Sequence, residues 1–170
     1  MREIAHKPDT DKLRIGVISD THGELDGAVV AALKGVDLII HAGDIDTPEL
    51  LACLKQTAPV TAVKGNMDRG RWAGGLPAAD VVQARGSHIY VLHDLQRLDL
   101  DPGAAGFRAV VCGHTHRPAI QRRGGVLFIN PGSAAYPRWG SDPSVAVLEC
   151  SGTRIEPRII FIQSQHRSPV

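Results

Sequence analysis

The first half of the chain alternates short apolar runs with helix-like stretches, and this alternation constrains the fold more than any other feature. β-Branched runs occupy Leu13 to Ser19, Val36 to His41 and Pro59 to Val63. The stretches between them, Leu25 to Leu33 and Thr47 to Lys55, are helix-like, and the second opens on Thr-Pro, a typical helix start. A β-α-β-α-β order needs crossover connections, so we expect a parallel sheet covered on both faces.

The second half changes to strand-like runs separated by tight turns. These runs span residues 81–84, 88–92, 109–112, 119–122, 126–129, 145–150 and 154–161. Glycine turn signals at 86, 124–125 and 152 predict antiparallel hairpins. We therefore expect a second sheet packed against the first, giving a single-domain α/β protein built as a two-sheet sandwich flanked by helices. The domain should span residues 13–162, between a flexible N-terminal arm (1–12) and a C-terminal tail (163–170).

Composition excludes several classes of protein. With 170 residues, 43% of them hydrophobic, the chain can bury the core of one domain. The balance of 19 basic and 18 acidic residues carries no nucleic-acid-binding signal. No apolar stretch approaches the roughly 18 residues of a membrane span and the polar start lacks a secretory core, so we expect a cytoplasmic protein. Cys53, Cys112 and Cys150 are odd in number and widely spaced, which predicts three small core residues rather than disulfides or a thiolate metal site.

Side chains able to bind metal follow five of the apolar runs. They are Asp20, His22, Asp44, Asn66, His93, His114 and His116, called the seven candidate ligands below. Loops converge at the carboxyl ends of parallel strands, so we expect these residues to meet. Two carboxylates, one amide and four imidazoles suit two metal ions, and Asp44, preceded by Gly43, is placed to bridge them. The pairs 20/22 and 114/116 can each point at one site if the backbone is extended there.

The same residues form five ordered motifs: Asp20-Thr21-His22, Gly43-Asp44, Gly65-Asn66, His93 and Gly113-His114-Thr115-His116. With these motifs, residues 14–138 resemble the calcineurin-like metallophosphoesterase family, in its small single-domain prokaryotic phosphodiesterase branch, whose Asn-Pro-Gly-Ser turn is matched at 130–133. The resemblance implies that one ion is bound by Asp20, His22, Asp44 and His116, and the other by Asp44, Asn66, His93 and His114. It implies two divalent ions, manganese, iron or zinc, with nickel as an in vitro substitute.

The activity implied by the resemblance is hydrolysis of phosphodiesters through in-line attack by a hydroxide bridging the two ions, without a phosphoenzyme. Asp44 and His114 would act in catalysis through the ions, while Asn66 and Arg138 would contact the substrate. Larger relatives carry a leaving-group histidine after Gly-Asn, where this chain has Met67. Methionine cannot donate a proton, so we expect no dedicated protein general acid and a preference for good leaving groups.

Several alternatives stay open. The activity could be that of a phosphomonoesterase, and the fold family includes a non-catalytic trafficking-coat scaffold, although none of the seven candidate ligands is replaced here. The segment Asp44-Ile45-Asp46-Thr47 approximates the nucleophile motif of haloacid dehalogenase-like phosphatases, but its threonine comes one residue early. A metallo-β-lactamase-like hydrolase would need His-x-His-x-Asp-His, which is absent from the sequence.

Other polar residues have less defined roles. Arg117 lies near the last motif and could hold a phosphate, while His41 and Asn130 could support the site without touching the substrate. We assign no metal to His6, His88 or His166. The partner should be a small-molecule phosphoester, selected by loops such as 69–76, expected to be exposed and flexible, and 94–106. Exposed edges of the second sheet are compatible with a homodimer.

Overall fold

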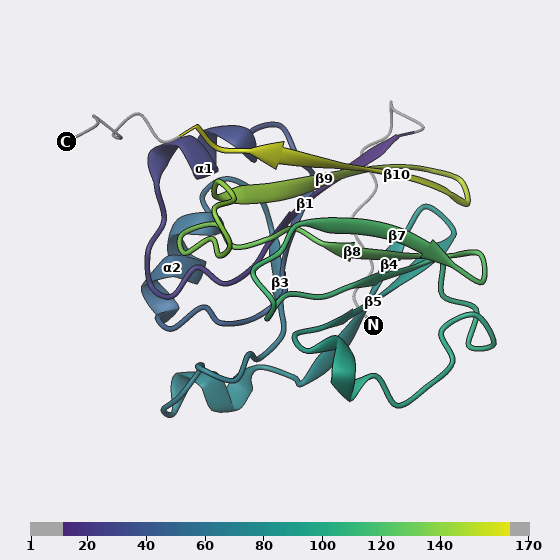
Figure 1. Cartoon of the computed structure of the whole chain (residues 1–170), viewed down its shortest axis with the longest axis horizontal. Coiled ribbons are helices and arrows are strands. Elements are labelled where there is room, and N and C mark those ends of the chain that lie inside the picture. The colour runs from purple at the N-terminus through teal and green to yellow at the C-terminus, as the bar shows by residue number, and fades with distance from the viewer. Residues whose placement is uncertain (1–11, 164–170) are drawn as a thin grey trace.

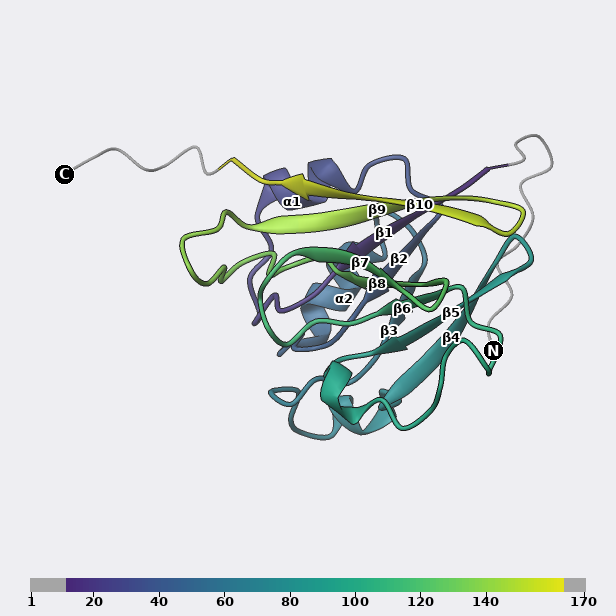
Figure 2. The same ribbon diagram turned by 45° about the vertical axis from the view of Figure 1, so that its right-hand side comes forward.

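The computed structural model describes residues 12–163, which form two facing five-stranded sheets (Figure 1). The first sheet, in the order β10-β9-β1-β2-β3, contains β1 (Leu13–Ile18), β2 (Leu38–His41), β3 (Val60–Ala62), β9 (Ser144–Ser151) and β10 (Arg154–Phe161). The second, in the order β4-β5-β6-β8-β7, contains β4 (Ala79–Ala84), β5 (Ser87–Leu92), β6 (Ala109–Val111), β7 (Ala119–Arg123) and β8 (Val126–Asn130). Figure 2 shows the same two sheets from a second angle. The predicted two-sheet sandwich is confirmed.

The parallel β-α-β-α-β unit predicted for the first half is present. Strands β1, β2 and β3 are parallel neighbours, connected by α1 (Gly27–Ala32) and α2 (Pro48–Leu54). Asp26 caps α1 by accepting the Ala28 N–H at 2.7 Å. Thr47 occupies the N-cap position of α2 as predicted, but its side chain makes no capping bond, and Pro48 begins the helix.

The sequence-based division of the chain into two sheets is wrong for the last two strands. Strands β9 and β10 belong to the first sheet, where β9 pairs antiparallel with β1. The reason lies in the burial of β9: Val145 and Val147 pack with the helices, while Ala146 and Leu148 pack between the sheets. A strand that is apolar on both faces is buried best inside a sheet that is covered on both sides.

The three predicted hairpins, β4–β5, β7–β8 and β9–β10, are antiparallel. The second sheet is nevertheless mixed, because β6 runs parallel to both β5 and β8. This arrangement brings the carboxyl ends of β5 and β6 to one edge of that sheet.

The core consists of three layers of apolar contacts. Ile15 and Ile40 of the first sheet meet Ile89 and Ile129 of the second in the middle layer. The two α-helices cover the outer face of the first sheet. The outer face of the second sheet is covered differently, by the short 3-10 helix η2 (Leu95–Arg97) and the loop after it. Within residues 12–163, α-helices therefore flank only one of the two sheets.

Some finer expectations need correction. Cys112 and Cys150 are buried as predicted, but Cys53 is exposed, because α2 turns Leu50 and Leu54 toward the core instead. The loop 69–76 includes the 3-10 helix η1 (Trp72–Gly75), whose Ala73 is buried. The expected arm, apart from residue 12, and tail, apart from residue 163, lie outside the described residues, as do the histidines at 6 and 166. In the part of the chain that is described, no helix has the length and apolar character needed to cross a membrane.

Candidate metal centre

All seven candidate ligands lie in loops that follow the carboxyl ends of five strands, β1, β2, β3, β5 and β6, as predicted. Backbone hydrogen bonds tie these loops together. The Asp20 N–H donates to the Gly43 carbonyl at 3.0 Å, and the Gly113 N–H donates to the His93 carbonyl at 2.9 Å. A loop of the second sheet is tied to a loop of the first by the His114 N–H, which donates to Asp20 Oδ2 at 3.0 Å. The fold thus brings the seven residues to one end of the sandwich.

One group of ligands consists of Asp20, His22 and His116, whose donor atoms lie within 4.8 Å of one another. His116 Nε2 is 3.2 Å from Asp20 Oδ1 and 3.4 Å from His22 Nε2. Asp20 Oδ1 is buried and accepts no hydrogen bond. Asp20 and His116 are buried, while His22 is partly exposed at the entrance.

A second group lies beside the first and consists of Asp20, Asp44 and His93. His93 Nε2 is 3.3 Å from Asp44 Oδ2 and 3.0 Å from Asn66 Oδ1. His114 joins through Nδ1, which is 3.0 Å from the same Asn66 oxygen. Asp20 therefore contributes to both groups, whereas the sequence singled out Asp44 as the bridging carboxylate.

The hydrogen bonds fix which imidazole nitrogens carry protons. The Nδ1 atoms of His93 and His116 donate to the backbone carbonyls of Ala42, at 2.7 Å, and Tyr136, at 2.6 Å. His22 Nδ1 donates to Asp46 Oδ2 at 3.3 Å. Carbonyl and carboxylate oxygens only accept, so in the neutral imidazoles all three Nε2 atoms hold lone pairs.

These lone pairs point at one another and at oxygen acceptors, with no donor between them. Such a convergence is unfavourable unless positive charge is present, because each buried acceptor needs a partner. Histidines that donate their second nitrogen to a carbonyl or carboxylate are typical metal ligands. The residues present therefore fit divalent cations in both groups.

The pKa shifts of the two aspartates and two of the histidines also indicate a site that favours positive charge. Burial would raise the pKa of Asp20, but the neighbouring His116 holds it below the usual value. The pKa of Asp44 is lowered in the same way, with burial opposed by His93. The pKa of His116 is raised, mainly by Asp20, and that of His93 is raised by Asp44 against the effect of burial. A cation would satisfy the same carboxylates.

The backbone at the ligands differs from the expected extended geometry. Asp20 (φ 54°), His22 (47°), His114 (69°) and His116 (58°) are all left-handed, as is Asp44 (55°). This conformation costs non-glycine residues energy and clusters at functional sites. Left-handed residues turn the chain tightly, so both members of each pair reach the centre from a sharp loop rather than from a continuing strand.

Two glycines allow the ligand loops to approach this closely. A Cβ atom on Gly65 would lie 2.1 Å from the backbone nitrogen of Asp44, and one on Gly43 would lie 2.7 Å from His93 Nδ1. Gly43 also has a φ of +95°. Any side chain at 65 would therefore displace Asp44.

Asp68 was not identified as a site residue from the sequence. Its carboxylate is 1% exposed and accepts four backbone N–H bonds: from Ile45 (2.7 Å) and Asp46 (2.8 Å) at Oδ1, and from Asp44 (3.1 Å) and Gly65 (2.7 Å) at Oδ2. It thereby joins the loop after β2 to the loop after β3. The only sequence signal is its position two residues after Asn66, which does not reveal the three donors that come from the loop after β2.

Other supporting residues surround the ligands. His41 is fully buried, with Nε2 3.0 Å from Thr21 Oγ1 and the Gly43 N–H donating to Nδ1 at 3.2 Å. Asn130 donates to the Gly113 carbonyl at 2.7 Å. Both therefore support ligand loops rather than holding a ligand position, in agreement with the secondary role expected for them.

The two arginines named from the sequence, Arg117 and Arg138, are both exposed. Arg138 is exposed, and its positive charge acts on His116 by lowering that pKa slightly against the larger effect of Asp20. Arg117 is also exposed, with its guanidinium carbon 4.5 Å from the centre of the Trp139 ring. Neither makes a hydrogen bond to a candidate ligand within residues 12–163.

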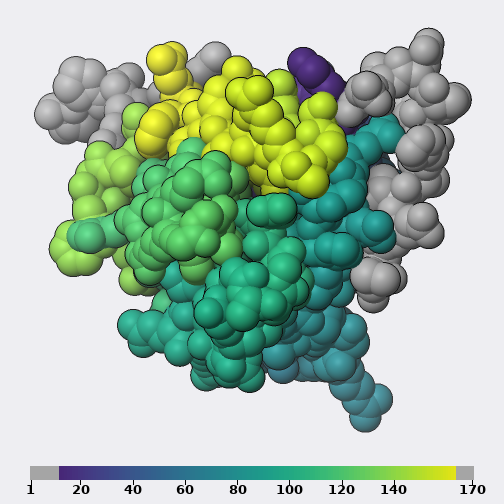
Figure 3. Space-filling view, turned by 90° about the vertical axis from the view of Figure 1, so that its right-hand side faces the viewer, coloured from purple at the N-terminus to yellow at the C-terminus, as the bar shows by residue number. Residues whose placement is uncertain are grey.

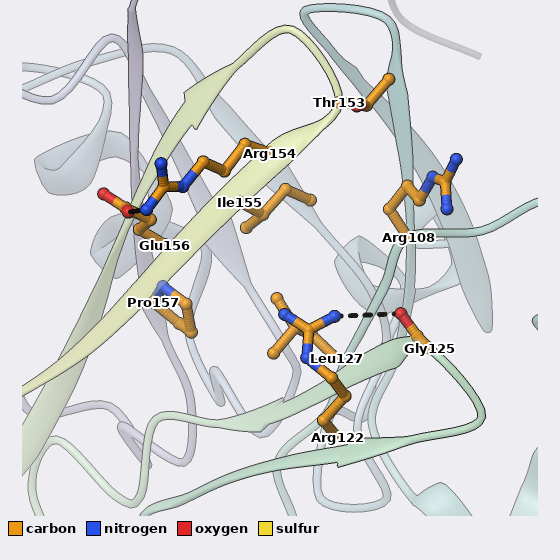
Figure 4. A pocket seen from close by; sticks show the side chains of 9 residues that line it. All are labelled: Arg108, Arg122, Gly125, Leu127, Thr153, Arg154, Ile155, Glu156 and Pro157. Carbon is orange, nitrogen blue, oxygen red and sulfur yellow. Dashed lines mark hydrogen bonds and ion pairs between the residues drawn. The ribbon is translucent and has the colours of Figure 1, made fainter.

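A hollow of about 640 Å³ lies elsewhere and is lined by none of the seven candidate ligands. It lies at the hairpin ends of the sandwich, and Figure 3 looks onto that side, where the β9–β10 hairpin (yellow) lies above the β7–β8 hairpin (green). In Figure 4, Arg122 reaches the Gly125 carbonyl and Arg154 turns toward Glu156. Because no candidate ligand lines this hollow, it is separate from the metal centre.

Comparison with known proteins gives the family. The calcineurin-like phosphoesterase superfamily domain matches residues 13–153. A probable metallophosphoesterase of Methanothermobacter thermautotrophicus is 37% identical over 158 residues, covering 86% of this chain and 91% of the relative. A second probable metallophosphoesterase, from Methanocaldococcus jannaschii, is 40% identical over 163 residues, covering 88% of this chain and 81% of the relative.

Solved structures with the same fold include a predicted phosphoesterase from Streptococcus pneumoniae, with a TM-score of 0.70 at 26% identity over 88% of this chain and 90% of that one. An archaeal phosphodiesterase has a TM-score of 0.72 at 22% identity, over 87% of this chain and 100% of that one. Vps29 of Cryptosporidium parvum has a TM-score of 0.71 at 21% identity, over 88% and 97%. The last two show a common fold only.

From the family match, the two archaeal relatives and the shared fold, we conclude that the chain belongs to the calcineurin-like phosphoesterase superfamily, whose members depend on divalent metals.

Proposed function

We propose that this protein is a metal-dependent phosphodiesterase that holds two divalent ions between its seven candidate ligands. The observation that carries the proposal concerns three Nε2 lone pairs without an intervening donor. Those of His93 and His116 face buried carboxylates, and that of His22 faces His116 Nε2. Manganese, iron and zinc are the metals that best suit this mixture of carboxylate, amide and imidazole ligands.

By the family's ligand pattern, Asp20, His22, Asp44 and His116 would hold one ion, while Asp44, Asn66, His93 and His114 would hold the other. The structure places Asp20 in both groups and Asp44 in the second, so either carboxylate is close enough to the other group to be shared. Bound divalent ions supply Lewis-acid chemistry, which activates water and offsets charge on phosphoryl oxygens. The protein supplies orientation: Ala42 and Tyr136 fix the rings of His93 and His116, and Asp68 fixes Asp44. Left-handed turns and buried hydrogen bonds hold these groups before the substrate arrives, which favours catalysis by preorganisation.

The substrate preference follows from Met67. Its backbone N–H donates to Asp44 Oδ1 at 2.8 Å, and 43% of the residue is exposed. A thioether placed there cannot protonate a departing alkoxide. We therefore propose diesters with acidic, readily leaving alcohols as substrates. Arg138, exposed near His116, would attract the phosphate, and Asn66 would contact the substrate as well as one ion.

The test is to change Asp44→Asn and to measure metal content and turnover together. The protein is loaded with Mn²⁺, desalted, and assayed with bis(4-nitrophenyl) phosphate. We expect both metal content and turnover to collapse, because Asp44 belongs to the second ligand group and its negative charge offsets the positive charge of the ions. Asp142→Asn, at an exposed aspartate, is the matched control and should change neither quantity. Full metal content with normal turnover in Asp44→Asn would show that the carboxylate is no ligand.

Two alternatives give different results in the same assay. A phosphomonoesterase would hydrolyse 4-nitrophenyl phosphate faster than the diester. A non-catalytic scaffold would bind metal and hydrolyse neither. The retention of all seven candidate ligands, with the outer hydrogen bonds that orient three of the histidines, favours catalysis over the scaffold.

A further inference from the structure

A pocket of about 400 Å³ opens beside the candidate metal centre, on the outer face of the second sheet, and is called the side pocket below. Alternate residues of β7, which share one face of the strand, line one wall: Ala119, Gln121 and Arg123. Leu95 and Gln96 of η2 also line it. Its volume lies within the range of roughly 300–1,000 Å³ that is usual for small-molecule sites.

The side pocket adjoins the metal centre through His114, the one candidate ligand that lines it. Gly113, His114, Thr115 and Asn130 line it, and they come from the last ligand motif and the residue that supports it. His114 is exposed, and its Nδ1 lies 3.0 Å from Asn66 Oδ1 in the second ligand group. A phosphoester held by that group would place an organic substituent next to His114, and so close to the side pocket.

The surface of the side pocket is mostly apolar. Leu95, Cys112, Ala119 and Phe128 supply hydrocarbon, thiol and aromatic surface. Asn130 offers little to a ligand, because its amide already donates to the Gly113 carbonyl at 2.7 Å and to Thr115 Oγ1 at 3.1 Å. An apolar surface left open beside a candidate centre is typical of the part of a site that binds an organic group.

Cationic groups with flat faces lie at the rim. The Arg123 guanidinium carbon is 5.2 Å from the centre of the Phe128 ring, and Arg117 also lines the side pocket. Planar guanidinium and phenyl groups stack on aromatic rings and favour flat ligands over flexible alkyl chains. We propose that the side pocket binds a flat aromatic group that is linked to the phosphorus of the substrate through an ester oxygen. This inference rests on the proposed phosphoesterase function and names the class of substrate.

The test uses probes that carry a single organic group. Phenylphosphonate and methylphosphonate are compared as ligands of the Mn²⁺-loaded protein by calorimetry, and as inhibitors of bis(4-nitrophenyl) phosphate cleavage. We expect the phenyl compound to bind roughly 10-fold more tightly, because the burial of one aromatic ring together with its contact to another ring changes a dissociation constant by about that factor.

Two variants locate this preference. Ala119→Trp fills the side pocket and should bring the ratio of the two dissociation constants close to one. Phe128→Leu keeps apolar volume but removes the ring, and should lower the ratio by roughly 3-fold or more. Ala105→Trp is the control, because residue 105 is exposed and does not line the side pocket. It should leave the ratio unchanged.

The outcomes separate the two proposals. Cleavage of the diester with a wild-type ratio near one, or with a ratio that neither variant lowers, would overturn the side-pocket inference alone. Absence of cleavage of any phosphoester by the loaded protein would overturn the proposed function, while calorimetry would still report whether the phenyl group is preferred. If Ala119→Trp does not fold, Phe128→Leu decides the result by itself.

Discussion

Replacing Asp68 by asparagine tests whether this residue holds the ligand loops together. The substitution keeps the shape of the side chain but leaves one carbonyl oxygen in place of two carboxylate oxygens. Each oxygen accepts two backbone N–H groups, so either orientation of the amide points its NH₂ group at two donors. Hydrogen bonds to a charged group contribute about 1.5–3 kcal/mol each, so losing two costs about 3–6 kcal/mol.

This loss is a large part of the about 5–15 kcal/mol by which domains are usually stable. For a chain of this length, about 3 kcal/mol corresponds to a decrease in Tm of roughly 6 °C or more. The assay is urea and thermal unfolding in the presence of a chelator, so that metal binding does not contribute. Asp101→Asn is the matched control: Asp101 also accepts two backbone N–H groups, but both at Oδ1 and on an exposed side chain. Its amide can keep both bonds, so little change is expected.

An unchanged urea midpoint with an unchanged slope for Asp68→Asn would refute the reasoning. If the carboxylate acts as described, metal affinity should also fall when the chelator is left out, because Asp44 and Gly65 lose a common partner.

Four further predictions can be checked on the same protein. Burial lowers the pKa of His41 from 6.5 to about 4. Between pH 7 and 5 this histidine is therefore protonated in the unfolded chain but stays neutral in the folded one, so about 2 kcal/mol of stability should be lost over that range. His41→Gln should abolish this pH-dependent loss in urea unfolding. A thiol reagent should label only Cys53 in the native protein, because the other two cysteines are buried, with pKa values raised to about 12. In metal titrations, His114→Ala and His116→Ala should each weaken a different ion, and loss of the same ion in both would contradict the division of ligands. Met67→His should increase turnover most for diesters with poor leaving groups, and a uniform gain across a leaving-group series would count against a missing proton donor.

Much of the local structure could be predicted because it depends on neighbouring residues. The strands around Ile15, Ile40 and Ile89 follow β-branched runs, and α2 begins at Pro48 as its sequence indicates. Assignment of β9 to the first sheet could not be predicted, since its pairing with β1 joins residues more than a hundred positions apart. Turn signals specify a hairpin, but they do not specify the sheet that the hairpin joins.

The same distinction between local and long-range determinants applies to the metal centre. The types and order of the seven candidate ligands, and the strand ends that carry them, are properties of the sequence alone. Side-chain type and the hydrophobic pattern that predicts a strand both depend only on neighbouring residues. Their left-handed turns, the entry of Asp20 into both ligand groups, and the four bonds of the Asp68 carboxylate were decided by the tertiary structure. So was the side pocket, which needs η2, β7 and β8 in their final places. A buried polar atom must find its partner wherever packing places one, and that partner comes from whichever segment the sheets bring near.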